Sequence, residues 1–164
     1  MKLSCAIIFA LVASFSPAVA QVTTAGLTKA ENLDRTVYGL GFTASAASGL
    51  GVSFRAHLPS KLSLQGVFGI IKTSDKLLLS IGGEGQYDLV RGNLTRFYIC
   101  SAASYFYEGS GGNEIGGPFR IGVGVGGEFY VRESFHVSVG GMFVYFSDGT
   151  ILPLPEISCH YYFF

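Results

Sequence analysis

A glycine-rich stretch of the chain has the spacing of a phosphate-binding loop. Residues 120–131 read R-I-G-V-G-V-G-G-E-F-Y-V, in which Gly122, Gly124 and Gly127 satisfy the dinucleotide pattern G-x-G-x-x-G. That pattern binds a nucleotide only where a strand leads into a helix, because the helix N-terminus receives the pyrophosphate. Here an apolar alternation continues through Val131, so we expect these glycines to belong to a strand and to bind no cofactor.

The composition limits the classes of protein to which the chain can belong. Its 164 residues suffice for one domain, and 11 basic against 11 acidic side chains leave no net field to attract nucleic acid. Only 13% of the residues are charged, and the mean hydropathy is +0.43. A chain this apolar must turn part of its surface toward something other than water.

The first 20 residues have the features of a secretory signal peptide. Lys2 precedes an apolar stretch over 3–15, and Ala18-Val19-Ala20 is an A-x-A cleavage signal. The polar segment 21–35 has capping-box spacing at 28–31, so it is either a short helix or a disordered periplasmic lead. After it no apolar run is long enough for a spanning helix, so a membrane-embedded mature chain must cross as strands.

Period-two alternation recurs in eight runs and predicts an all-β fold. Most runs have about the 9–11 residues that a tilted strand needs to cross a bilayer. A soluble sandwich would carry charges on its outer face, whereas here the charges alternate with the apolar set that we assign outward. We therefore predict an eight-stranded antiparallel transmembrane β-barrel over 36–164. The predicted strands are 36–45, 50–58, 62–73, 76–90, 94–107, 119–131, 135–146 and 156–164.

The connectors between the runs alternate in length. Residues 59–61, 91–93 and 132–134 are tight polar turns, whereas 108–118 and 147–155 are the longest of the intervening loops. Short turns on one side and longer loops on the other are typical of outer-membrane barrels. We expect a surface ligand, if there is one, to bind through these two long loops.

The chain ends on an aromatic strand, with S-C-H-Y-Y-F-F at 158–164. A terminal Phe with Tyr two positions earlier resembles the outer-membrane β-signal, and the whole pattern resembles the small eight-stranded outer-membrane barrels of the OmpA-transmembrane and OmpX-like group. The resemblance implies export through the periplasm to the bacterial outer membrane, with lipid and lipopolysaccharide around the barrel. It also implies that periplasmic chaperones and the barrel assembly machinery recognise Tyr162 and Phe164. That signal would turn Tyr162 outward, whereas period-two alternation turns Tyr161 and Phe163 outward, and the register stays open.

Eight strands enclose a lumen only wide enough for side chains, so we expect a plugged barrel. Buried charges must be paired and hydrogen-bonded, and the inward positions hold three basic and three acidic side chains. Most of these positions lie near a periplasmic turn, which predicts a polar plug in the periplasmic half. The expected network comprises Arg55, His57, Gln65, Glu84, Asp88, Arg96, Arg120, Glu128 and His136.

The outer half of the predicted lumen carries small residues. Glycines there leave room for a shallow cavity that opens outward, and this space would also permit a narrow carrier of small apolar molecules. The glycines concerned are Gly39, Gly41, Gly82, Gly122 and Gly124.

One pair of residues in the predicted lumen could do nucleophilic chemistry. His136-x-Ser138 resembles the His-x-Ser pair of the lipid A deacylase barrels, and the resemblance implies the serine as nucleophile and the histidine as its base. Val139-Gly140 stands where that family has Asn-Ala, and the pair lies at the periplasmic end, away from the outer-leaflet substrate. We therefore expect no catalytic site and keep a lipid A-modifying enzyme as the alternative.

The remaining candidates for metal binding are two cysteines of the mature chain. Cys100 and Cys159 lack companions at zinc spacing and belong to strands that are not neighbours, so we expect free thiols and no metal site. The sequence thus favours an integral outer-membrane barrel with a plugged lumen and a structural or surface-interaction role, without catalytic activity.

Overall fold

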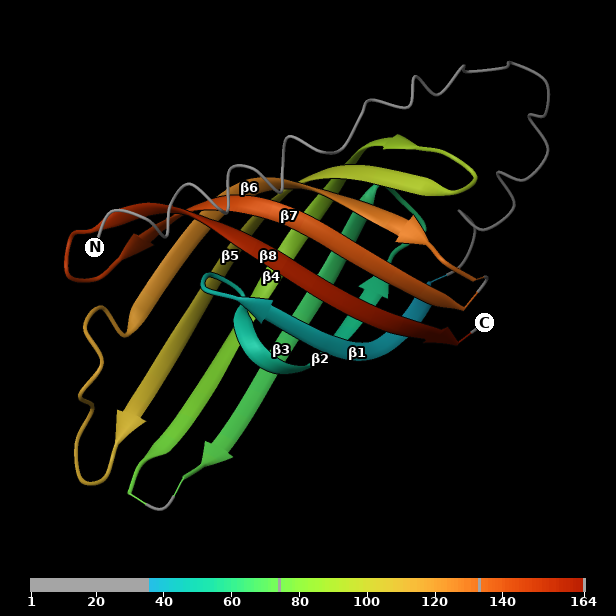
Figure 1. Cartoon of the computed structure of the whole chain (residues 1–164). Helices are drawn as coiled ribbons and strands as arrows, with labels where there is room; N and C mark the ends of the chain where they lie inside the picture. Colours follow the sequence, from blue (N-terminus) through green and yellow to red (C-terminus); the bar gives the residue numbers. More distant parts are fainter. Residues whose placement is uncertain (1–35, 74, 133, 164) are drawn as a thin grey trace, which may run out of the picture.

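The computed structural model describes residues 36–73, 75–132 and 134–163, which form a closed barrel of eight antiparallel strands in chain order. The predicted signal peptide, 1–20, and lead segment, 21–35, lie outside the described residues. No helix in the described part of the chain is long and apolar enough to cross a membrane. The strands, shown in Figure 1, are β1 (Val37–Ser45), β2 (Gly49–His57), β3 (Leu62–Lys72), β4 (Leu77–Arg91), β5 (Thr95–Gly109), β6 (Phe119–Tyr130), β7 (Phe135–Phe146) and β8 (Ile151–Phe163).

The two ends of the barrel differ. One, here called the terminal end, holds the start of β1, the end of β8 and the short connections after β2, β4 and β6. The other, the loop end, holds the connections after β1, β3, β5 and β7, of which 110–118 is the longest. The tight turns and the 110–118 loop therefore lie on opposite ends, as the connector lengths predict.

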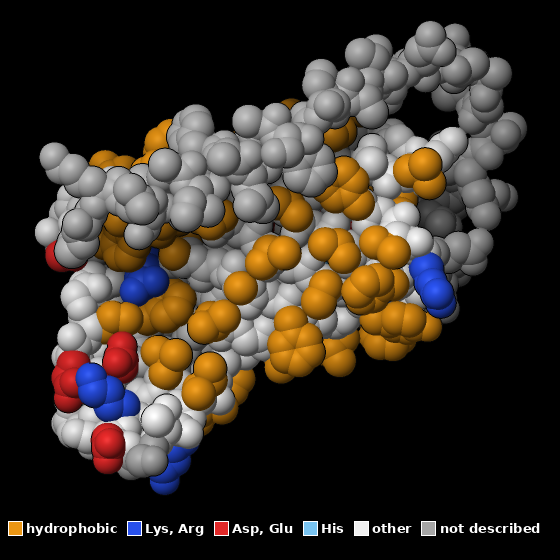
Figure 2. Space-filling view, viewed as in Figure 1, with side chains coloured by type: hydrophobic (Ala, Val, Ile, Leu, Met, Phe, Trp, Pro, Cys, Tyr) orange, Lys and Arg blue, Asp and Glu red, His pale blue; other side chains and the backbone are white. Residues whose placement is uncertain are grey.

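Each strand turns one set of side chains outward and the other into the lumen, because successive Cβ atoms point to opposite faces of the sheet. Along β5 the burial alternates strictly from Arg96 to Phe106. The outward set is apolar and well exposed, with Phe42 at 63% and Phe143 at 64%. Figure 2 shows hydrophobic side chains spread over the barrel wall, with Lys, Arg, Asp and Glu gathered toward its ends. This is the reverse of a water-soluble surface.

The eighth strand begins five residues earlier than predicted. Seven predicted strands match the observed ones within two residues at each end, but β8 starts at Ile151, so the predicted loop 147–155 is wrong and only 147–150 forms a turn. The added segment contains Pro153 and Pro155, although proline usually interrupts a strand.

The two prolines lie on a free edge of β8. Pairing of β8 with β1 stops at Ser45 and Glu156. The Cys159 carbonyl faces β1 at Gly41, so odd-numbered residues of β8 direct their backbone groups toward β1. Pro153 and Pro155 therefore lack N–H groups at positions where β1 supplies no acceptor, which is where proline is tolerated.

The β1–β2 turn enters the lumen. β1 and β2 have nine residues each, against 15 in β4 and β5, and Figure 1 shows their turn ending short of the other loop-end connections. Ala47 and Ser48 of this turn are completely buried. A Cβ at Gly122 would overlap the Ala47 methyl, and one at Gly82 would overlap the Ser48 carbonyl.

The space beside the lumen glycines, whose occupant the sequence left open, is filled by the chain itself. The turn occupies the space at Gly82 and Gly122, and the Tyr162 ring covers Gly39. At Gly41 the β8 backbone approaches closely, and at Gly124 the β7 backbone and Met142 do so. An apolar cluster completes this half of the lumen, with Ala47, Tyr98, Cys100, Ala102, Met142 and Val144 as its buried members.

Candidate functional site

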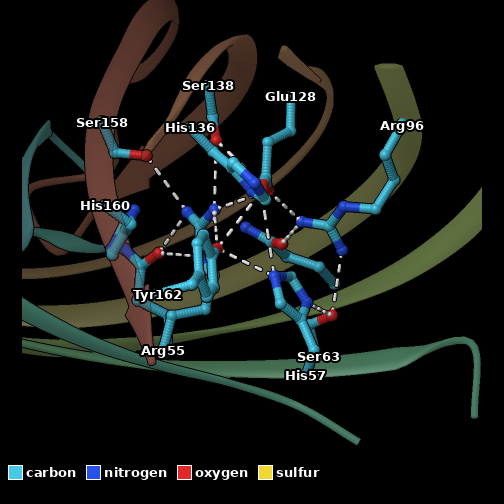
Figure 3. A network of polar contacts seen from close by, with 12 residues as sticks. Arg55, His57, Ser63, Arg96, Glu128, His136, Ser138, Ser158, His160 and Tyr162 are labelled. Atoms are coloured by element: carbon cyan, nitrogen blue, oxygen red, sulfur yellow. Dashed lines mark hydrogen bonds and ion pairs between the residues drawn. The ribbon is translucent and has the colours of Figure 1, made fainter. Parts of the chain in front are cut away.

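Glu128 on β6 is the centre of the polar network in the terminal half of the lumen (Figure 3). It is completely buried and accepts hydrogen bonds from Arg55 at 2.8 Å and Arg96 at 2.5 Å. Its other oxygen lies 2.7 Å from His136 Nδ1 and 3.2 Å from the Tyr162 hydroxyl, which donates to it. Because ionised hydrogen-bond partners shorten and strengthen these contacts, one carboxylate joins five strands.

Arg55 on β2 uses its guanidinium to reach three further strands. Its Nε donates to Gln65 Oε1 at 2.7 Å, and Nη2 contacts the same oxygen. Nη1 donates to Ser138 Oγ at 3.0 Å, and Nη2 to Ser158 Oγ at 3.1 Å. The fixed fork of the guanidinium suits several acceptors at once, so the desolvation cost of this buried cation is offset by hydrogen bonds on all sides.

Arg96 on β5 forms the second cationic group of the network. It donates to Asp88 Oδ1 at 2.7 Å, Gln86 Oε1 at 2.7 Å and Ser63 Oγ at 2.9 Å, and Arg91 binds the other Asp88 oxygen. Two buried guanidinium groups thus meet the carboxylates of Glu128 and Asp88, so the charges balance in this layer.

A stack of aromatic rings closes the terminal end. Tyr162 lies between His57, with ring centroids 4.9 Å apart, and His136, at 4.5 Å, and Tyr130 stacks on His136 at 4.4 Å. His57 Nδ1 is 2.6 Å from Ser63 Oγ, and its Nε2 is 2.8 Å from the Tyr162 hydroxyl. The ring stack therefore rests on the same hydrogen bonds as the charged layer.

The structure brings seven of the nine predicted network residues into direct contact with Arg55, Arg96 or Glu128, or with one another. Glu84 joins only at the margin, where Gln86 Nε2 donates to its Oε1 at 2.8 Å. Arg120 lies apart at the loop end, with its guanidinium 4.0 Å above the Phe106 ring and 4.8 Å above Phe146. The seven are Arg55, His57, Gln65, Asp88, Arg96, Glu128 and His136.

Several buried polar residues of the lumen are absent from the predicted network. Each lies at an inward-facing position of β2, β3 or β4, or at an even-numbered position of β8. Counting every second residue along each observed strand would have found them. The important one is Glu156, which stood at the edge of the wrongly predicted loop. The set comprises Ser53, Ser63, Gln86, Glu156, Ser158 and His160.

The alternative catalytic pair lies inside this network. Ser138 is 1% exposed, and its Oγ accepts from Arg55 and donates to Glu128 at 3.5 Å. His136 Nδ1 is held by Glu128. The serine oxygen is thus occupied by two charged groups at the terminal end, beneath the ring stack.

Tyr162 faces the lumen. It is 1% exposed, while Tyr161 and Phe163 on either side are 53% and 55% exposed. Period-two alternation thus continues to the end of β8, and the outward orientation that the β-signal resemblance implied for Tyr162 is wrong. Phe164 lies outside the described residues, and recognition of this strand by assembly machinery stays a prediction.

The two cysteines are free thiols, as predicted, with Cys100 buried in the lumen and Cys159 half-buried. Within the described ranges no group of three or more His, Cys, Asp or Glu side chains could hold a metal ion.

Comparison with known proteins gives structural likenesses alone. No family model and no curated protein matches the chain. Neisserial surface protein A is 17% identical, with 77% of this chain and 90% of that one covered and a TM-score of 0.42. The outer membrane protein Ail of Yersinia pestis is 13% identical, with 79% and 99% covered and a TM-score of 0.43. A de novo designed transmembrane β-barrel is 16% identical, with 78% and 93% covered and a TM-score of 0.42. The barrel assignment stands on the strand pairing of this chain.

Proposed function

We propose that this chain is an integral protein of the bacterial outer membrane whose barrel is sealed by its own side chains and has no catalytic activity. The observation that carries the proposal is the buried cluster of Arg55, Arg96 and Glu128, in which the Arg55–Glu128 contact crosses the lumen from β2 to β6. The role is structural, with surface contacts through the loop end.

The exterior supports a membrane location. The outward positions of every strand are mainly apolar, with Ser101 of β5 a polar exception, and aromatic rings lie near both ends of the wall. Tyr38 pairs with Phe163 at the terminal end, and Tyr105 pairs with Phe119 at the loop end, and all four side chains are exposed. Aromatic residues at both ends of an apolar band are typical of outer-membrane barrels. Because periplasmic turns are short in such barrels, the proposal assigns the terminal end, with its short connections, to the periplasm.

Three layers support a sealed lumen rather than a carrier or pore. The ring stack covers the periplasmic end, the charged layer fills the next level, and the β1–β2 turn with its apolar neighbours fills the outer half. A carrier of apolar molecules would need the space that Ala47 and Ser48 occupy.

The loop after β5 is the best surface for a partner. Asn113 orders it, since its Oδ1 accepts from the backbone N–H of Glu108 at 3.0 Å and its Nδ2 donates to the Phe106 carbonyl at 2.9 Å. Lys76 bridges Glu114 at 3.0 Å and Glu108 at 3.4 Å, and these carboxylates raise the pKa of Lys76. The loop end thus presents a fixed, mixed-charge surface, although each exposed ion pair adds little stability.

Conductance measurement tests the sealed barrel. Wild-type protein reconstituted in a planar bilayer is expected to show no single-channel steps. The triple variant Arg55→Ser, Arg96→Ser, Glu128→Ser removes the charged layer and is expected to conduct, with unboiled gel migration as the check that it has folded. Steady channel opening by the wild type would overturn the proposal.

A further inference from the structure

The wall of the barrel has an opening at the loop end, above the short β1–β2 hairpin. β3 continues through residues 69–72 against β4 after its pairing with β2 has stopped. β8 runs through residues 151–155 against β7 before its pairing with β1 begins. Each segment therefore has a neighbouring strand on one side only, and the gap between them is two strands wide (Figure 1). At about 3.3 Å per residue and a strand tilt of about 40°, this opening, here called the notch, is about 10–13 Å deep along the barrel axis.

The notch exposes apolar side chains on both faces of the two flanking strands. Inward-facing residues are buried along most of each strand, yet Ile71 of β3 is 52% exposed and Leu152 of β8 is 43% exposed. The outward-facing neighbours Ile70 and Ile151 are 58% and 62% exposed. Large apolar side chains that are open on both sides of a wall point to an apolar occupant.

The surfaces at the inner side of the notch and beside it are apolar as well. Ala46 of the β1–β2 turn and Leu154 of β8 lie half-buried on the apolar cluster of the lumen. A groove of about 400 Å³ adjoins the β8 edge, lined by residues 153–155 of β8 and 140–143 of β7. Because none of these residues carries a charge, the recess suits a hydrocarbon chain.

A strand from a partner protein fits the β8 edge poorly. Odd-numbered residues of β8 direct their backbone groups toward β1 and hence, at 151–155, into the notch. Of the three residues concerned, Pro153 and Pro155 have no N–H group and only Ile151 can donate. An added strand would lack partners there, as at other sheet edges that proline protects. We therefore favour a lipid over a second copy of the chain as the occupant.

A cation lies at the mouth of the notch. Lys72 ends β3, is exposed, and forms no ion pair with a carboxylate of the described chain, Asp75 included. Lys76 on the same hairpin is already bound by two carboxylates. On the β8 side, the Asp148 carboxylate accepts from the backbone N–H of Thr150 at 2.9 Å. Lys72 is thus the cation that an anionic head group would meet.

We propose that the notch binds a phosphorylated lipid of the outer leaflet, with one acyl chain between residues 69–72 and 151–155 and the phosphate at Lys72. The depth of the notch is most of that of one hydrocarbon leaflet, about 15 Å, so a chain whose phosphate lies at Lys72 reaches its inner side. The acyl chain then covers the apolar residues that the short β1–β2 hairpin leaves open. The proposal rests on the membrane location proposed above, with the loop end outside, and does not depend on the sealed lumen.

Tryptophan fluorescence in lipid vesicles tests the proposal, because the natural chain contains no Trp. Ile71→Trp places a reporter in the notch, and Val125→Trp, on the outward face of β6, is the control. Each variant is reconstituted in phosphatidylcholine vesicles with a small fraction of either phosphatidylglycerol or phosphatidylcholine that carries brominated chains. The brominated anionic lipid is expected to quench position 71 with about fivefold higher apparent affinity than the zwitterionic one. Position 125 is expected to show no preference.

Two charge variants and a second reporter complete the experiment. Lys72→Gln is expected to abolish the preference at position 71, whereas Lys61→Gln removes an exposed cation at the terminal end and is expected to leave it. Leu152→Trp, on the opposite edge of the notch, is expected to behave like the reporter at position 71. Unboiled gel migration checks that each variant has folded.

Equal quenching by the two brominated lipids at positions 71 and 152 would overturn the proposal, and so would a preference that survives Lys72→Gln. Shielding of both reporters from either lipid as the protein concentration rises would also overturn it, since a second copy would then fill the notch. The membrane location is tested separately by position 125. If neither brominated lipid quenched that reporter, the barrel would not lie in the bilayer, and the proposed function itself would be wrong.

Discussion

Arg55 and Glu128 lie 73 positions apart in the chain and meet at 2.8 Å in the lumen, with neither side chain exposed. The contact joins β2 to β6, which are not neighbours in the wall. Strand pairing alone would leave opposite sides of the barrel free to flatten toward each other. This ion pair, with Arg96 as its third member, holds the cross-section from within.

Replacement of Glu128 by Gln is expected to destabilise the barrel by about 3–5 kcal/mol, because Arg55 would keep its buried charge without a carboxylate and Arg96 would keep only Asp88. The midpoint of the gel-shift transition on heating measures the effect. Glu114→Gln removes an exposed carboxylate as the control. Equal midpoints for the two variants would contradict a central role for Glu128.

Removing the hydroxyl group from each of two neighbouring tyrosines in turn tests which face of β8 points into the lumen. Tyr162→Phe loses the oxygen that contacts His57 and donates to Glu128, so a loss of about 1–3 kcal/mol is expected. Tyr161→Phe, one position earlier on the exposed face, is expected to change little. Urea unfolding in detergent compares them, and a larger effect at position 161 would mean that the register is reversed.

Contact between Gly122 and the β1–β2 turn can be tested by overpacking and rescue. Gly122→Ala places a Cβ against the Ala47 methyl and is expected to cost about 1–3 kcal/mol. Ala47→Gly removes that methyl, so the double variant should recover most of the loss. Gly85→Ala is the control, since open space surrounds a Cβ there. Without recovery in the double variant, the buried position of the turn would be wrong.

Catalysis by the His136–Ser138 pair has a direct test in cells. Lipid A mass spectra are expected to be the same with wild type, Ser138→Ala and no protein, because Ser138 Oγ is engaged by Arg55 and Glu128. Ser158→Ala removes another Arg55 acceptor and controls for indirect effects on folding. A mass change that requires Ser138 but not Ser158 would support the deacylase alternative.

Most of the barrel could be predicted from the sequence because the pleat has a period of two. Once a strand is located, its inward residues follow, as they did for Arg55, Arg96 and Glu128. The prediction was wrong at 151–155. Proline usually interrupts a strand, but β8 tolerates Pro153 and Pro155 because β1 does not pair with it there.

The sequence by itself determined which side chains face the lumen and which face outward, since alternation along a strand is a local property of the backbone. The tertiary structure decided the level of each side chain along the barrel axis, and hence which side chain it contacts. Gln65 pairs across the wall with both Arg55 and Glu84, yet it bonds Arg55 and not Glu84. The tertiary structure also determines what fills the loop-end half of the lumen. The turn of the short β1–β2 hairpin lies inside the lumen because the neighbouring strands extend beyond it. Gly122, which belongs both to the phosphate-loop pattern and to the predicted lumen glycines, makes room for that turn.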